Sequence, residues 1–238
     1  MSSITTTRDG AAVTITLDRA QEGNLLPVDA VRELAAAFRA ASATDAKVIV
    51  LRGIGTDFCR GRGAGGPPSP TAMKLRANVC EPILDAYEAM SMAHQPIVGV
   101  VQGAALGFGC AIASVCDITI AHDTARFKLP EMEKDLPPTL AMSAVMPRVP
   151  RKVLAWMVYA MDELDARTAQ QVGIVSKVAP SAQVKGEVAK LLATMTARSP
   201  EALVAVKDFL RSAPHMEPRG MADYGANLLA SVLSSAGK

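Results

Sequence analysis

The chain has 238 residues, of which 50% are hydrophobic, 20% charged and 4% aromatic, and its formal net charge at pH 7 is +2. A chain of this length and composition is expected to be a soluble globular protein that buries its core without disulfides or metals. The near balance of charge excludes a strongly basic nucleic-acid binder, and the few aromatic side chains leave no base-stacking platform, so we expect a small-molecule ligand.

The cysteines and the N-terminal residues give no sign of a metal site or of export. The cysteines form no Cys-x-x-Cys pair, and no histidine lies at a ligand spacing from them, so no metal is expected. Residues 1–10 are polar, and no apolar run is long enough to span a membrane. We therefore expect a reducing, cytoplasmic location and no membrane partner.

Apolar spacing in the first quarter of the chain alternates between strand and helix periods. Alternation predicts a strand at 13–17, and an unbroken apolar run predicts a buried strand at 48–51. Between them, apolar residues at helical spacing predict a helix that begins after Asp29, which is expected to be its N-cap. The glycines and prolines of residues 61–70 predict an exposed, poorly ordered loop.

The rest of the chain continues the same alternation. We expect strands at 97–101, 117–121 and 174–178, and helices at 83–90, 152–161, 184–197 and 201–211. An apolar segment at 221–233 should either cap the domain or pack on a neighbouring subunit. Interleaved strands and helices predict an α/β fold in which helices cover the strands.

Two of the buried strands each lead into a glycine-containing turn, at residues 55–62 and 103–109. Such turns expose backbone N–H groups, and the N-terminus of a following helix adds partial positive charge. Two N–H groups directed at one point form an oxyanion hole, although the glycines could instead serve only to permit tight turns. Neither turn has the pattern of a phosphate loop, and residues 107–109 are too short for a dinucleotide fingerprint.

The order of several sequence blocks resembles the crotonase superfamily, also called the enoyl-CoA hydratase/isomerase family. The blocks are residues 57–62, 102–110 with 116–118, 125–131 with 136–138, and 166–175 with 202–207. The resemblance covers residues 11–211. It implies an α/β, crotonase-like superhelix of ββα units over 1–180, and a C-terminal helical region, 181–238, that makes the contacts of a homotrimer or a dimer of trimers.

The resemblance also implies a reaction and a set of site residues. The substrate would be an acyl-CoA thioester, with coenzyme A as part of the substrate and no permanently bound cofactor. Its carbonyl oxygen would accept hydrogen bonds from the backbone N–H groups of Arg62 and Phe108, and Glu131 would be the general acid/base. Positions implied to contact the thioester or its coenzyme A are Gly23, Leu25, Arg60, Arg62 and Gly107. Arg60, Arg62 or Lys207 is expected either to pair with a coenzyme A phosphate or to be a solvated surface charge.

The sequence departs from the family pattern at the position that matters most for water addition. Hydratases of the family carry a second glutamate where this chain has Ala111. Moving a double bond needs one carboxylate, so Glu131 alone is compatible with isomerase chemistry. Asp135 would share a face with Glu131 if this segment were an α-helix, but it is more simply a solvent-facing residue. The histidines, and the cysteines at 59 and 110, are expected to be structural.

Two other readings remain open. A decarboxylase, hydrolase or lyase that acts on another CoA thioester could use the same oxyanion hole. A non-catalytic or RNA-binding member of the superfamily would not need Glu131, and RNA binding would be unusual at a net charge of +2.

Overall fold

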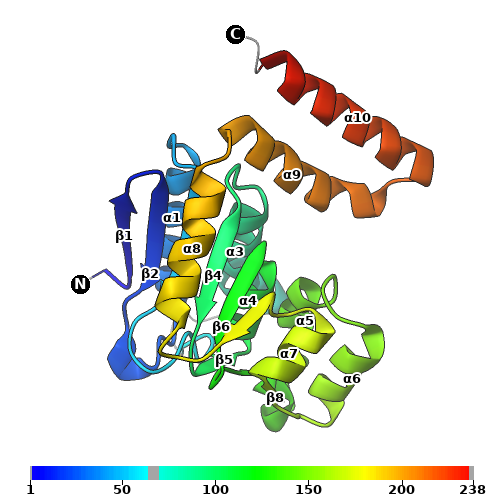
Figure 1. Ribbon diagram of the computed structural model, residues 1–238. Coiled ribbons are helices and arrows are strands. Elements are labelled where there is room, and N and C mark those ends of the chain that lie inside the picture. The colour runs from blue at the N-terminus through cyan, green and yellow to red at the C-terminus, as the bar shows by residue number, and fades with distance from the viewer. Residues whose placement is uncertain (1, 64–69, 236–238) are drawn as a thin grey trace.

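The computed structural model describes residues 2–63 and 70–235, and Figure 1 shows its layers. The main sheet has six strands in the order β1-β2-β3-β4-β6-β9. Their bounds are β1 Ile4–Asp9, β2 Ala12–Leu17, β3 Val48–Gly53, β4 Ile97–Val101, β6 Ile118–His122 and β9 Lys177–Ala179. Strand β1 runs antiparallel to β2, and every other neighbouring pair is parallel.

Helices cover both faces of this sheet, as the interleaved pattern predicted. Helices α1 (Val28–Ser42) and α3 (Glu81–Ser91) pack against each other on one face, and α8 (Val184–Thr196) lies on the other (Figure 1). Val48 and Val98 pack against Met195 of α8. Burial on both faces explains why β3 and β4 are continuous apolar runs.

The structure corrects two expectations about the N-terminal part. The N-cap of α1 is Pro27 and not Asp29, because the fixed φ of proline ends the extended segment there and the helix begins at Val28. Asp29 lies in the first turn and pairs with Arg32 at 2.9 Å. Strand β1 was not predicted, because only its first residue, Ile4, is buried and the strand has no apolar alternation.

A second, three-stranded sheet lies beyond the end of β4. Its order is β5-β7-β8, with β5 Ala104–Leu106, β7 Arg126–Lys128 and β8 Leu164–Asp165. Strand β5 separates β4 from helix α4 (Phe108–Val115), where the sequence predicted a direct passage from strand through turn to helix. The remaining elements before α8 are η1 Ala20–Glu22, α2 Ala72–Leu75, η2 Arg76–Cys80, η3 Pro130–Lys134, α5 Thr139–Val145, α6 Arg151–Tyr159 and α7 Ala166–Val172.

The chain ends in a helical hairpin that stands away from the sheet (Figure 1). It consists of α9 (Pro200–Ser212), η4 (Ala213–His215) and α10 (Pro218–Ser235). An apolar groove of about 400 Å³ runs between the two helices, and its lining includes Val206 and Leu229, about 60% exposed. The predicted C-terminal helices are confirmed, whereas their role in subunit contacts stays a prediction.

Three further expectations from the sequence concern a loop, membrane-spanning segments and metal sites. Most of the loop predicted at 61–70 lies outside the described residues. In the described part of the chain, no helix is both long enough and apolar enough to cross a membrane. Residues 2–63 and 70–235 also contain no group of three or more side chains suited to hold a metal ion.

Candidate active site

The two glycine-containing segments lie side by side and are joined by backbone hydrogen bonds. The Cys59 N–H donates to the Ala104 carbonyl at 3.0 Å, and the Leu106 N–H donates to the Cys59 carbonyl at 2.9 Å. A Cβ atom on Gly109 would lie 2.0 Å from the Cys59 carbonyl oxygen, so only glycine permits this approach. The pairing brings the predicted N–H donors into one region.

Three polar side chains hold these segments in register. Asn24 is fully buried, and its Nδ2 donates to the carbonyl oxygens of Ile54 at 2.9 Å and Asp57 at 2.8 Å. Asp57 Oδ1 accepts the Ala104 N–H at 2.8 Å, and Gln102 Nε2 donates to the Gly53 carbonyl at 3.0 Å. This frame of hydrogen bonds was not predicted from the sequence. The available sign of it was Asn24, a single asparagine that precedes two leucines.

The two predicted oxyanion donors have no acceptor among the turn and loop carbonyls of the described residues. Leu26 pairs with the first segment through the Gly61 carbonyl and the Gly63 N–H, so the Arg62 N–H takes no part in that pairing. Phe108 is the first residue of α4, and the N–H groups of a first helical turn have no acceptor within the helix. Within the described residues, neither N–H donates to a turn or loop carbonyl.

Glu131 reaches the same region from η3. A Cβ atom on Gly107 would lie 2.7 Å from Glu131 Oε1, so the carboxyl group rests against the turn that precedes Phe108. Its other oxygen, Oε2, is buried and has no hydrogen-bond partner within the described residues. Burial raises the pKa of the Glu131 carboxyl above its ordinary value, and a backbone hydrogen bond opposes this shift. A buried acceptor without a partner is unusual in a folded protein and points to a ligand or to proton transfer.

The surroundings of Glu131 are mainly apolar. The rings of Tyr87 and Phe108 stack with centroids 5.7 Å apart, and Ala111 is fully buried. Burial raises the pKa of the Cys110 thiol to about 12, with the charge of Glu131 as a second cause, so this thiol is not an active nucleophile. Tyr87 lies within the helix predicted at 83–90, but its proximity to the site was not predicted from the sequence.

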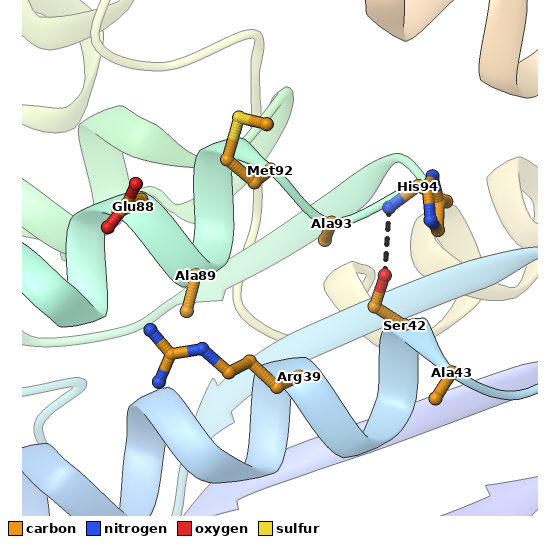
Figure 2. Close-up of a pocket in the computed structure, with 8 residues that line it drawn as sticks. All are labelled: Arg39, Ser42, Ala43, Glu88, Ala89, Met92, Ala93 and His94. Carbon is orange, nitrogen blue, oxygen red and sulfur yellow. Dashed lines mark hydrogen bonds between the residues drawn. The ribbon is translucent and has the colours of Figure 1, made fainter.

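A separate groove lies at the C-terminal ends of α1 and α3, and Figure 2 shows it. Its volume is about 430 Å³, and Arg39, Glu88 and His94 are among its lining residues. The Oγ of Ser42 accepts the His94 N–H at 3.0 Å. None of the residues assigned to the site from the sequence lines this groove, so we do not connect it with Glu131.

Comparison with known proteins identifies the family of this chain. The profile of the family described as enoyl-CoA hydratase/isomerase matches residues 7–236. The chain belongs to this family. It is 32% identical over 217 residues to 2,3-dehydroadipyl-CoA hydratase of Escherichia coli (strain K12), which covers 89% of this chain and 82% of that protein.

Solved structures of the enoyl-CoA hydratase/isomerase family show the same fold. Human enoyl coenzyme A hydratase domain-containing protein 3 superposes with a TM-score of 0.90 at 21% identity, covering 98% of this chain and 92% of that one. An enoyl-CoA hydratase of Mycobacterium smegmatis gives a TM-score of 0.90 at 22% identity, covering 97% and 91%. The predicted crotonase-like α/β fold is confirmed.

The positions that the family resemblance assigned to the thioester or its coenzyme A lie in or beside the first segment, apart from Gly107, which lies in the second. The Arg60 N–H donates to the Gly23 carbonyl at 3.0 Å, and a Cβ atom on Gly23 would lie 2.3 Å from Arg60 Cδ. The side chains of Arg60 and Arg62 are exposed, and Leu25 is half-buried. Gly23 and Arg60 are therefore in contact, and the Arg62 guanidinium donates to the Gly63 carbonyl at 3.1 Å.

The structure corrects the sequence expectation for Lys207 and confirms the solvent-facing role preferred for Asp135. Lys207 is only 4% exposed, and its Nζ lies 3.0 Å from Asp117 Oδ2, so it is neither a surface charge nor available to a coenzyme A phosphate. Asp135 does not share a face with Glu131, because the segment is a 3₁₀-helix and Asp135 follows it in a left-handed conformation, exposed to solvent.

Proposed function

We propose that this chain processes acyl-CoA thioesters, with Glu131 as general acid/base and the N–H groups of Arg62 and Phe108 as an oxyanion hole. One observation carries the proposal: the buried, unpartnered Oε2 of Glu131 belongs to a carboxyl group that rests against the turn leading into Phe108. A proton acceptor and an oxyanion donor on adjoining groups suit the formation of an enolate.

The reaction begins when the thioester carbonyl oxygen accepts hydrogen bonds from the two N–H groups. Glu131 removes a proton from the carbon next to the carbonyl or from the γ-carbon of the enoyl chain, and the electron pair moves onto the carbonyl oxygen. The donors stabilise the negative charge that forms there. Glu131 then returns the proton at the other carbon. Burial raises the pKa of the Glu131 carboxyl above its ordinary value, which makes the carboxylate a stronger base.

Ala111 favours isomerisation over hydration. Adding water to an enoyl thioester requires one group that activates the water and one that delivers a proton, and two carboxylates divide these tasks. The methyl group of Ala111 supplies neither, and it is fully buried. We therefore propose that the enzyme moves a double bond in its acyl chain more readily than it adds water to a simple 2-enoyl-CoA.

The remaining proposals concern binding and assembly. Coenzyme A would lie along Gly23, Leu25, Arg60 and Arg62, because the two exposed guanidinium groups can pair with its phosphates. The apolar groove of the C-terminal hairpin would be covered by a neighbouring subunit of a homotrimer or a dimer of trimers, since exposed Leu229 and its neighbours form a continuous apolar face.

The test is a panel of enoyl-CoA thioesters incubated with purified protein in H₂O and D₂O, with products read by mass spectrometry. Isomerisation leaves the mass unchanged in H₂O, and water addition raises it. Glu131→Gln should reduce turnover by about 10² to 10⁴, whereas Glu133→Gln, which alters only an exposed partner of Lys128, should not. Release of CO₂ or of free coenzyme A would instead assign the decarboxylase or hydrolase alternative.

A further inference from the structure

Tyr87 brings a phenol from α3 to the candidate site. Its side chain is almost entirely buried, with 9% of the residue exposed, and its ring stacks on Phe108 at an interplanar angle of 18°. Phe108 follows Gly107, against which Glu131 rests. Tyr87, Phe108 and Glu131 therefore form one cluster, although they come from three different elements.

The phenol and the carboxylate are close enough to affect each other. Burial raises the pKa of Tyr87, and the charge of Glu131 is the next largest cause, so the phenol keeps its proton throughout the physiological pH range. Within the described residues, Glu131 Oε2 has no hydrogen-bond partner, so Tyr87 does not donate to it directly. A proton donor and a free acceptor thus lie in the same cluster without contact.

The other titratable groups around this cluster are weaker candidates for a donor. Burial raises the pKa of the Cys59 and Cys110 thiols to about 12, and a thiol is a weak donor. The Cys59 thiol also donates to the Asn24 carbonyl. Lys128, on the strand before η3, pairs with Glu133 at 2.5 Å. The Tyr87 phenol is the strong neutral donor of the cluster.

We propose that Tyr87 is a positioning residue of this site, whose phenol hydroxyl stabilises the charged form of the Glu131 carboxyl group within the buried cluster and whose ring fixes the Phe108 N–H. The inference rests on the proposed function, because it assigns a second polar group to a site in which Ala111 supplies none. The sequence had offered Asp135 for that place, with a solvent-facing role preferred.

The experiment separates the hydroxyl from the ring. Tyr87→Phe keeps the stacked ring and removes the donor, Tyr87→Leu removes both, and Tyr159→Phe changes an exposed tyrosine of α6 as the matched control. The pKa of Glu131 is measured in the protein without substrate, by NMR of ¹³C-carboxyl-labelled glutamate, with the resonance assigned from its loss in Glu131→Gln. Turnover is measured on the thioester that the panel identifies.

Loss of the phenol hydroxyl from the cluster should destabilise the charged carboxylate and raise the pKa of Glu131 by about half to one unit in Tyr87→Phe, and Tyr159→Phe should not change it. The kcat of Tyr87→Phe should fall about 10- to 100-fold with KM changed less than about threefold, and Tyr87→Leu should lose more because the Phe108 N–H is no longer fixed.

An unchanged Glu131 pKa in Tyr87→Phe overturns the inference, and so does a kcat equal to that of the wild type. Because the titration needs no substrate, it decides the role of Tyr87 even if no thioester is turned over. A failure to turn over any thioester would overturn the proposed function and not this inference.

Discussion

Lys207 and Asp117 form a buried ion pair that ties the C-terminal hairpin to the main sheet. Lys207 Nζ lies 3.0 Å from Asp117 Oδ2, which also accepts the Ile97 N–H at 2.7 Å. The ammonium group donates to the carbonyl oxygens of Gln95 at 2.9 Å and Met90 at 3.3 Å. One side chain of α9 thereby holds the end of α3, the start of β4 and the residue before β6.

Removing one partner of this pair should be costly. Lys207→Met keeps an apolar stem but leaves the Asp117 carboxylate unpaired, so the free energy of unfolding should fall by about 3 to 5 kcal/mol in urea titrations. The double variant Asp117→Asn, Lys207→Met should recover part of that loss. Arg219→Met, which removes an exposed i,i+4 pair with Asp223, should leave stability unchanged. Equal stabilities for wild type and Lys207→Met would contradict the anchoring role.

Glu131 should stabilise the protein less as the pH rises. Its pKa is raised in the folded state, so between the ordinary value near 4.5 and the folded value the native protein binds more protons than the unfolded chain, and stability falls with increasing pH. Glu131→Gln should therefore raise the Tm at pH 7 to 8, and the gain should vanish near pH 4, where the carboxyl group is protonated in both states. Scanning calorimetry across this pH range is the measurement, and a gain in Tm that does not change with pH would contradict the prediction.

A carboxylate at position 111 should create hydratase activity. Ala111→Glu restores the second carboxylate and should raise the rate of water addition to crotonyl-CoA, at a cost of about 1 to 3 kcal/mol because the site is fully buried. Ala111→Gln has nearly the same size without the charge and is the control. The prediction fails if both variants hydrate at the same rate, or if the wild type already matches a two-glutamate hydratase assayed alongside it.

Gly109 should tolerate no side chain. The Cβ of Gly109→Ala would meet the Cys59 carbonyl oxygen at 2.0 Å and push the two paired segments apart, so we expect a loss of about 1 to 3 kcal/mol and a lower kcat as the Phe108 N–H moves. Gly186→Ala in α8 meets no atom within 4 Å and should raise stability by about 0.5 to 1 kcal/mol. Denaturant titrations of both variants, with turnover of the first, check the contrast.

The elements that could be predicted from the sequence are those that have the same kind of surroundings along their whole length. Strand 97–101 is buried on both faces and matches β4 residue for residue, because an apolar run needs no partner to be recognised. Strand β1 is exposed along most of its length, and β5, β7 and β8 have two or three residues each, too few for a period. The existence of β1 depends on its pairing with β2, and that of β5, β7 and β8 on pairing with strands more than 15 residues away.

The residues of the candidate site also divide into those that could be predicted from the sequence and those that could not. Glu131 and the two glycine turns lie in local blocks, so a resemblance could locate them, although their roles remain proposals. The frame around Asn24 and the place of Tyr87 depend on contacts between residues far apart in the sequence, such as Asn24 with Ile54 and Tyr87 with Phe108. A helical lysine ordinarily faces solvent, and the burial of Lys207 is explained only by partners outside the helix, chiefly Asp117.

The order of strands in the main sheet matches their order of synthesis. Within this sheet, each later strand pairs with the open edge of the strand made before it, and none is inserted between two earlier strands. The sheet can therefore grow on the ribosome from its N-terminal edge. The edge of β6 stays unpaired for the longest time, because the ribosome must still synthesise the chain from His122 to Lys177 before β9 can pair with it. At about 5 to 20 residues per second, this takes roughly 3 to 11 seconds. During that interval its unpaired backbone is open to strands of other nascent chains, and this is when a ribosome-associated chaperone has most to protect.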